Sequence, residues 1–254
     1  MSGSGLDSSS VIVTGGGAGI GRATALKFAA EGARVVVADL DAEGARTVVE
    51  EITAAGGTAV AVVGDLSEQT VVGEVVAKAL DAFGGVDVLV NNAGIMDAMT
   101  APADVTDAEW ERVIRINLTA PFRLTRAVLP HMLERGKGAI VNVGSEASLR
   151  GSAAGAAYTA SKHGIVGLTK SLAVMYRTSG IRANAVAPGG TRTAITSGLG
   201  FEGHGPDTLM PLMGNIGRLA EPEEQAAVIV FLASDAASSI NGAVIAVDDG
   251  WSAV

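Results

Sequence analysis

Short apolar runs recur along the chain and alternate with longer segments. The runs are rich in Val and apolar at successive positions, which is typical of strands buried on both faces of a parallel sheet. The pattern predicts strands at residues 11–14, 34–38, 58–63, 86–90, 139–143, 181–187 and 242–247. The segments between them are long enough for crossover helices, at residues 20–31, 42–55, 67–83, 107–135, 156–179 and 222–234.

Repeated alternation of strand and helix predicts an α/β fold. We expect a doubly wound, Rossmann-like parallel sheet of about seven strands with helices on both faces. No linker rich in Pro, Gly or Ser divides the chain and no repeat appears, so residues 1–254 are predicted to form a single domain. Residues 1–10 are expected to be a flexible N-terminus.

Residues 191–217, which we call the substrate loop, do not fit this rhythm. They separate the sixth strand from the last helix, and they contain many glycines together with Met210 and Met213. A connection this long in a compact domain is usually functional, often as a lid. We expect residues 201–213 to be less ordered than the core until a ligand binds. A flexible insertion without a function is the alternative.

Composition narrows the possible functions. The formal net charge is -9, so an anionic phosphate backbone would be repelled, and no Lys/Arg cluster offers a local site for nucleic acid or anionic lipid. The longest apolar run, residues 226–233, is far shorter than the roughly 18 residues that suggest a membrane span, and it is predicted to be a buried helix. We therefore expect neither nucleic acid nor a membrane as a partner.

Cysteine is absent and the histidines, His131, His163 and His204, lack the spacing of metal ligands. The sequence therefore predicts no disulfide, no thiolate site and no metal centre. The first ten residues lack the apolar stretch of a signal peptide, and a cytoplasmic location is expected.

A glycine-rich segment, TGGGAGIG at residues 14–21, follows the first strand and opens the first helix. Glycines let a backbone turn tightly and approach a pyrophosphate, whose charge is favoured at a helix N-terminus. Asp39 follows the second strand, 18 residues after Gly21, where an acid can bind the adenosine ribose hydroxyls. The alternatives are a structural turn for the glycines and a helix N-cap for Asp39.

Tyr158 and Lys162 are four residues apart in a predicted helix and therefore share a face. Ionising an unperturbed tyrosine at neutral pH costs about 4 kcal/mol, and a nearby ammonium lowers that cost. The pair is a candidate general acid/base, although this spacing also occurs by chance. Ser145 and Asn91 follow the fifth and fourth strands, and the carboxyl ends of parallel strands are where ligands bind.

Taken together, these motifs resemble the short-chain dehydrogenase/reductase family, in its shorter, single-domain branch. The likeness extends over residues 11–250 and rests on motifs that occur in order: TGGGAGIG, Asp39, Asp65, NNAG at residues 91–94, Asn117, Ser145, YTASK at residues 158–162, and Pro188-Gly189. The resemblance implies an oxidoreductase that transfers a hydride between NAD and a secondary alcohol or ketone.

The resemblance also implies a role for each matching residue. It places the pyrophosphate on Gly15, Gly19, Ile20 and Gly21. It places the adenosine ribose on Asp39 and adenine against Asp65 and Leu66. It gives the rest of the cofactor site to Asn91, Ala93, Gly94, Tyr158, Lys162, Pro188, Gly189, Thr191 and Thr193. The catalytic residues it implies are Asn117, which fixes a water, Ser145, which binds the substrate oxygen, Tyr158, the acid/base, and Lys162, which lowers the pKa of Tyr158.

The cofactor is expected to be NAD, with NADP disfavoured. Asp39 would repel the extra phosphate of NADP, and no Arg or Lys stands in the glycine segment to offset it. Arg34, at the start of the second strand, and Arg22, on the first helix, are not well placed to do so, and Arg22 is the better candidate of the two. Two departures from the family pattern bear on the substrate. Thr191 replaces an expected aliphatic residue, and Glu146, after Ser145, is expected either to face solvent or to meet a polar substrate.

The expected substrate is a small cyclic or hydrophobic alcohol, with a sugar as the alternative. Apolar residues expected near the substrate, in addition to Ser145 and Tyr158, are Ile95, Met96, Leu149, Met210 and Met213. The alternative functions are a 3-oxoacyl-thioester reductase and a non-catalytic NAD-binding sensor. Because the family commonly forms tetramers of two-fold symmetry, a homotetramer is expected.

Overall fold

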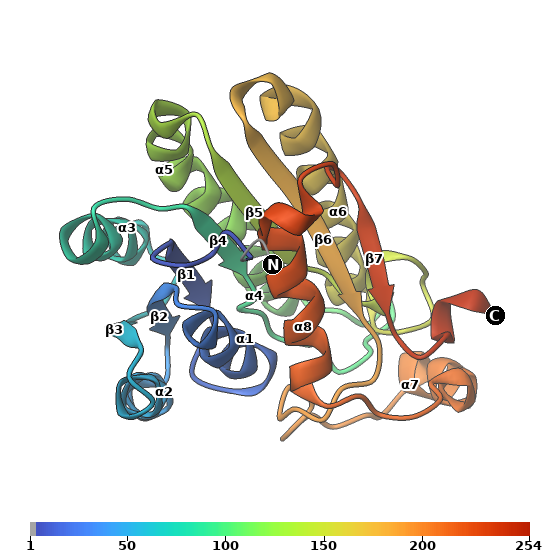
Figure 1. The fold of residues 1–254 in the computed structure, drawn as a ribbon. Helices are drawn as coiled ribbons and strands as arrows, with labels where there is room; N and C mark the ends of the chain where they lie inside the picture. Colours follow the sequence, from blue (N-terminus) through green and yellow to red (C-terminus); the bar gives the residue numbers. More distant parts are fainter. Residues whose placement is uncertain (1–3) are drawn as a thin grey trace.

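The computed structural model describes residues 4–254 and contains one sheet of seven parallel strands (Figure 1). The strand order is β3-β2-β1-β4-β5-β6-β7, so the chain winds outward from β1 and then outward from β4 on the other side. The strands are β1 Ser10–Thr14, β2 Arg34–Asp39, β3 Thr58–Val63, β4 Val88–Asn91, β5 Gly138–Val143, β6 Ile181–Pro188 and β7 Val244–Val247. The predicted doubly wound α/β fold is confirmed.

Helices cover both faces of the sheet, as Figure 1 shows. They are α1 Gly19–Ala30, α2 Ala42–Ala54, α3 Gln69–Phe83, α4 Asp107–Ile114, α5 Ala120–Arg135, α6 Ala156–Tyr176, α7 His204–Leu209 and α8 Pro222–Ala233. One core cluster contains α1, α2 and α8, and a second contains α3, α5 and α6. Within β1, Val11 and Val13 belong to the first cluster and Ile12 to the second, because successive strand residues point to opposite faces.

The single helix predicted for residues 107–135 consists of three parts. A π-helical turn, Arg115–Thr119, separates α4 from α5 and contains the buried Asn117. Such turns insert one extra residue per turn and are frequent at functional sites. The apolar pattern continues through the turn, so the sequence did not reveal the break.

Part of the expected flexible N-terminus, residues 1–10, packs against the domain. Residues 1–3 lie outside the described part of the chain. Leu6 is 2% exposed and belongs to the first core cluster, so residues 4–9 do not extend freely from the domain. Ser10 is already the first residue of β1, and its N–H donates to the carboxylate of Asp87 (2.8 Å).

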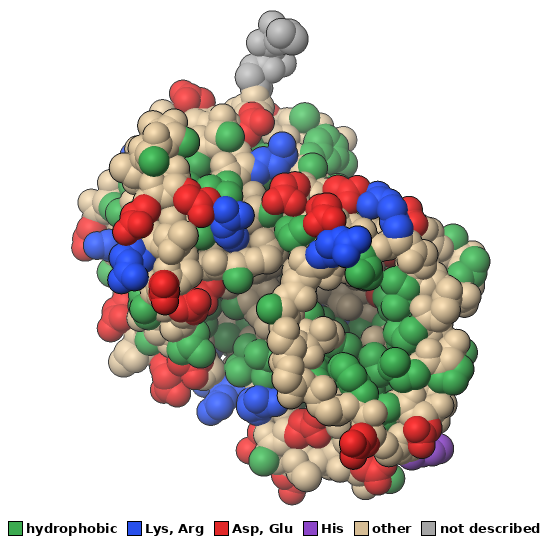
Figure 2. Space-filling model, turned by 90° about the horizontal axis from the view of Figure 1, so that it is seen from below, with side chains coloured by type: hydrophobic (Ala, Val, Ile, Leu, Met, Phe, Trp, Pro, Cys, Tyr) green, Lys and Arg blue, Asp and Glu red, His purple; other side chains and the backbone are tan. Residues whose placement is uncertain are grey.

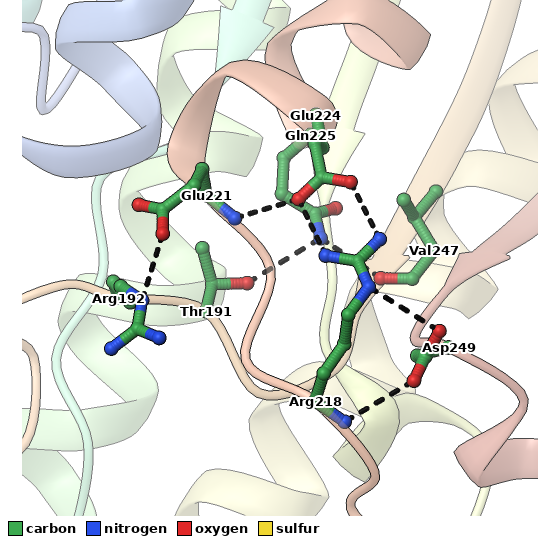
Figure 3. A network of polar contacts seen from close by, with 8 residues as sticks. All are labelled: Thr191, Arg192, Arg218, Glu221, Glu224, Gln225, Val247 and Asp249. Atoms are coloured by element: carbon green, nitrogen blue, oxygen red, sulfur yellow. Dashed lines mark hydrogen bonds and ion pairs between the residues drawn. The ribbon is translucent and has the colours of Figure 1, made fainter.

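The substrate loop is structured and its two ends meet. It contains α7 and a 3-10 turn, Met210–Asn215. Thr191 and Ala220 form a parallel bridge between the start of the loop and the residues that follow it. Beside this bridge lies the network of Figure 3, in which Arg192 pairs with Glu221 (2.8 Å) and Arg218 pairs with Glu224 (2.6 Å). The loop therefore begins and ends at one cross-linked base, between β6 and α8.

Candidate active site

The turn after β1 is built for close contact with a ligand. Gly15 and Gly19 have φ angles of +62° and +50°, a region that side-chain-bearing residues rarely adopt. A Cβ on Gly21 would overlap the carbonyl oxygen of Gly15. Ala18, the N-cap residue of α1, offers no side chain to the free N–H groups of the helix. Gly21 therefore serves packing of the turn, and the open helix N-terminus fits a pyrophosphate.

A cavity of about 440 Å³ opens at this carboxyl edge of the sheet. Figure 2, which views the molecule from below Figure 1, shows a hollow on this face with hydrophobic side chains beside it. The predicted site residues that line the cavity are Gly15, Gly19, Ile20, Asp39, Asp65, Leu66, Ala93, Gly94, Ile95, Ser145, Tyr158, Lys162, Pro188, Gly189, Thr191 and Thr193. Those that do not line it are Gly21, Asn91, Met96, Asn117, Met210 and Met213.

Asp39 is held at the cavity by backbone groups. Its Oδ2 accepts from the N–H of Gly17 (2.7 Å) and its Oδ1 from the N–H of Asp41 (2.9 Å). Asp41, not Asp39, is the N-cap of α2, so the alternative role for Asp39 is wrong. Arg22 pairs with Glu51 at 2.6 Å and is not turned toward Asp39.

Asn91 does not line the cavity as expected. Its side-chain amide donates to Thr125 (3.1 Å) and Asn142 (2.8 Å) in the buried interior. The next residue, Asn92, lines the cavity and donates to the carbonyl oxygens of Thr14 and Gly15. Asn91 therefore links strands and helix α5, and Asn92 holds the glycine turn.

Tyr158, Ser145 and Lys162 come together at the cavity, as the helical spacing predicted. Burial raises the pKa of Tyr158 to about 12, while a hydrogen bond with Ser145 lowers it and the charge of Asp97 raises it. Lys162 lies 5.5 Å from the centre of the Tyr158 ring and donates to the carbonyl oxygen of Val143 (2.9 Å). Burial lowers the pKa of Lys162 to about 8. The lowering of the Tyr158 pKa by Lys162 stays a prediction.

Asn117 is buried behind these residues. Its side chain accepts from the N–H of Ile95 (2.9 Å) and donates to the Ile95 carbonyl oxygen (2.8 Å) and to Ser161 (3.2 Å). Gly94 lies between Asn117 and Lys162, since a Cβ there would be 3.3 Å from Asn117 Oδ1 and 3.5 Å from Lys162 Nζ. Asn117 thus fixes the loop after β4, and its water-binding role stays a prediction.

Tyr158 belongs to a small apolar cluster. Trp251 belongs to its buried part, and Ile95, Met96 and Met213 pack against it. Leu149 and Met210 are 41% and 51% exposed, so they do not contribute to this cluster as expected. Trp251 was not predicted as a site residue because the contact joins the end of the chain to α6.

Glu146 neither faces solvent nor reaches the cavity, so both expectations for it are wrong. It is 1% exposed and pairs with Arg150 Nε at 2.5 Å. Burial raises its pKa, Arg150 opposes this, and contact with Asp248 raises it further. Arg150 also donates to the carbonyl oxygen of Val254 (2.8 Å). Glu146 therefore helps to fasten the end of the chain beside Ser145.

The described residues 4–254 hold no group of three or more His, Asp or Glu placed to bind a metal ion. Within the same part of the chain, no helix is long and apolar enough to cross a membrane.

Comparisons with known proteins agree over nearly the whole chain. A family model described as short chain dehydrogenase matches residues 9–201. Cis-4-hydroxycyclohexanecarboxylate dehydrogenase of Sinomonas cyclohexanicum is 43% identical over 96% of this chain and 96% of its own. 3β-Hydroxysteroid dehydrogenase 2 of Eggerthella lenta is 38% identical over 98% of this chain and 96% of its own.

A solved structure extends the agreement to three dimensions. It is a protein assigned as an NAD(P)-dependent gluconate 5-dehydrogenase from Beutenbergia cavernae, with NADP bound at low occupancy. It superposes with a TM-score of 0.87 at 41% sequence identity, over 99% of this chain and 100% of that one.

Proposed function

Because the chain belongs to the short-chain dehydrogenase/reductase family, we propose that it oxidises a compact, mainly apolar cyclic alcohol with NAD, or reduces the corresponding ketone. Hydride transfer between a nicotinamide dinucleotide and a secondary alcohol or ketone is the activity of such an oxidoreductase. The observation that carries the proposal is the meeting of Ser145, Tyr158 and Lys162 in one cavity beside the glycine turn.

NAD is the proposed cofactor, and the residues present fit it. Gly15, Gly19 and Ile20 would hold the pyrophosphate and Asp39 the adenosine ribose. When bound, NAD⁺ accepts the hydride and contributes a positive charge. Asp39 is preorganised by two backbone N–H groups, and Arg22 is engaged by Glu51 and does not stand ready to offset a 2′ phosphate. This favours NAD over the NADP carried by the Beutenbergia protein.

Proton transfer is assigned to Tyr158. Ser145, which contacts the Tyr158 hydroxyl, would bind the substrate oxygen with it, and the phenolate would then take the alcohol proton. Because burial raises the pKa of Tyr158 to about 12, the phenolate needs nearby positive charge, which Lys162 would supply on the same helix face. General acid/base catalysis of this kind raises the reaction rate by about 10²–10⁴-fold.

The apolar cluster around Tyr158 supports the proposed substrate class. Ile95 of this cluster lines the cavity, and Met96 and Met213 pack against the same cluster, where Met side chains can adapt to varied shapes. The two relatives named above are dehydrogenases of a hydroxycyclohexane carboxylate and of a hydroxysteroid, which both carry a hydroxyl on a ring. We propose that the substrate loop closes over such a ring, as a lid of the single domain.

The experiment is a turnover assay with cyclohexanols, hydroxysteroids, sugars and linear alcohols, each with NAD⁺ and with NADP⁺. Reduction of a 3-oxoacyl thioester and NADH binding are measured alongside. We expect turnover of ring alcohols with NAD⁺. Turnover of only the thioester or only sugars would overturn the substrate class. Tight NADH binding without any turnover would support the sensor alternative.

A homotetramer and a cytoplasmic location are part of the proposal. Exposed apolar side chains on α5 and α6, among them Phe122, Leu133, Val174 and Met175, support association of copies. A monomeric mass by light scattering at micromolar concentration would contradict the first, and fractionation of cells tests the second.

A further inference from the structure

Asp97 is a buried acid that the chemistry above does not use. It lies in the segment between β4 and α4 and is 1% exposed. Its Oδ1 accepts from the N–H groups of Met99 (3.1 Å) and Gly155 (2.9 Å), and its Oδ2 accepts from the N–H of Tyr158 (2.9 Å). One carboxylate thus binds three backbone donors, including that of the acid/base residue itself.

Two of these donors belong to the start of α6. Gly155 is the N-cap residue of that helix and has no side chain to cap it. Asp97 takes over this role from another segment, and a carboxylate is favoured at a helix N-terminus. The fit is tight, because a Cβ on Gly155 would lie 2.7 Å from each Asp97 oxygen and 2.5 Å from the Thr100 nitrogen.

The same segment is held in a strained form that also contacts the substrate loop. Met99 has a φ of +59°, which is rare for a residue with a side chain, and is 6% exposed. Gly205 of α7 lies directly against the Met99 carbonyl oxygen, where a Cβ would overlap. The Thr100 carbonyl oxygen accepts from the N–H of Ala156 in α6 (3.0 Å). Residues 97–100 therefore bridge α6 and α7.

We propose that Asp97 is a positioning residue, which fixes the backbone of Tyr158 by capping α6 and ties that helix to the substrate loop. The proposal rests on the proposed function. Strain at Met99 persists because Asp97 supplies the hydrogen bond that holds it. A small displacement of a reacting group can cost about 10²-fold in rate, so a fixed α6 start matters for catalysis.

The charge of Asp97 provides a distinctive signature. The charged groups near Tyr158 include Asp97 from the β4–α4 segment and Lys162 from α6 itself, whose Nζ lies 5.5 Å from the Tyr158 ring centre. Glu109 of α4 faces Asp97 from the other side. Since the negative charge of Asp97 raises the pKa of Tyr158, removing that charge should shift the Tyr158 ionisation to lower pH.

The test compares Asp97→Asn with Gly155→Ala and a control. Asp97→Asn removes the charge and one acceptor, and Gly155→Ala disturbs the same contact without changing charge. Asp87→Asn is the control, because Asp87 also accepts a backbone N–H but lies at the opposite edge of the sheet. We expect kcat to fall about 10- to 100-fold in both site variants, with the KM for NAD unchanged. Only Asp97→Asn should move the pH profile of kcat to lower pH.

A substrate-free measurement keeps the test decisive. Tyr158 and Tyr176 are the only tyrosines, so in a Tyr176→Phe background the tyrosinate absorbance reports Tyr158 alone. Circular dichroism at each pH and NADH binding check that each variant is folded. Earlier ionisation in Asp97→Asn supports the proposal, even where no alcohol of the panel is turned over. Unchanged ionisation and kcat, with only a lower Tm, would overturn it. Absence of turnover in the unmodified protein would instead count against the proposed function.

Discussion

The two halves of the carboxyl edge are built in different ways. On the half formed by β1, β2 and β3, backbone groups make the contacts: Gly16 donates to the Ala38 carbonyl oxygen (3.3 Å), and Gly64 donates to that of Asp39 (2.9 Å). On the half formed by β5, β6 and β7, side chains far apart in the sequence also make contacts, as in the pairs Arg192–Glu221 and Arg218–Asp249.

This difference separates what is rigidly required from what can vary. We call the half formed by β1, β2 and β3 the nucleotide half and the other the substrate half. The backbone contacts of the nucleotide half require glycines that leave room, so few substitutions are tolerated at those positions. Side-chain pairs can be replaced one at a time, and exposed pairs contribute little energy each. The substrate half is therefore the part in which specificity can change while the cofactor chemistry stays the same.

The largest effect is expected at the junction of the halves, for Tyr158→Phe. The variant lacks the hydroxyl that moves the proton, so kcat should fall by about 10²–10⁴-fold or more. NADH binding should persist, because the glycine turn is untouched. Tyr176→Phe, at the far end of the same helix, is the control and should be active. A near-normal kcat in Tyr158→Phe would show that Tyr158 is not the general acid/base.

Lys162→Met should change the pH dependence of stability. Burial lowers the pKa of Lys162 from 10.5 to about 8, which corresponds to about 3 kcal/mol. The unfolded chain takes up the proton first as pH falls, so the unmodified protein loses this stability between pH 10.5 and about 8, and no more below. Urea unfolding across this range should show the loss in the unmodified protein but not in Lys162→Met.

Lys170→Met is the control for that experiment, because Lys170 is exposed on the same helix. The pH dependence of its free energy of unfolding should match that of the unmodified protein. Equal pH dependence in all three proteins would show that burial of Lys162 does not cost stability. Activity should be lost in Lys162→Met, since the ammonium is needed beside Tyr158.

Cofactor choice tests the nucleotide half. The carboxylate of Asp39 and a 2′ phosphate about 4 Å apart would repel by about 4 kcal/mol at a surface-like dielectric and about 1 kcal/mol in water. We expect NAD to be preferred by at least about tenfold in kcat/KM, since about 1.4 kcal/mol is tenfold. Asp39→Asn should narrow that gap, whereas Asp41→Asn should not. Equal use of both cofactors by the unmodified protein would contradict this role for Asp39.

The smallest effect is expected at the base of the substrate loop. Arg218→Gln removes contacts to Glu224 and Asp249 (Figure 3). Exposed pairs are weak, so the KM for the alcohol should rise only about two- to fivefold, with the KM for NAD unchanged. Arg46→Gln, which breaks an exposed pair with Glu50 on the nucleotide half, is the matched control. A larger change in the KM for NAD than for the alcohol would break the contrast between the halves.

The contrast also explains what the sequence could predict. The glycine turn, Asp39 and the Tyr158–Lys162 pair depend on local geometry, so spacing located them. Asn91 was misplaced because neighbouring residues at a strand end point to different sides, and the sequence does not say which side faces the cavity. The contact of Glu146 with Asp248 and the packing of Trp251 in one cluster with Tyr158 join residues about a hundred positions apart, and no local pattern reports such contacts.

The joined ends of the substrate loop have a consequence for how this fold diversifies. Thr191 and Ala220 lie side by side, so the segment between them begins and ends at one point, as the ends of an Ω-loop do. A segment of different length or composition could be grafted between these two residues without altering the register of β6 and β7. Because Thr193 within this segment also lines the cavity, we expect a chimera that keeps both the bridge and Thr193 to change the substrate range while hydride transfer is retained.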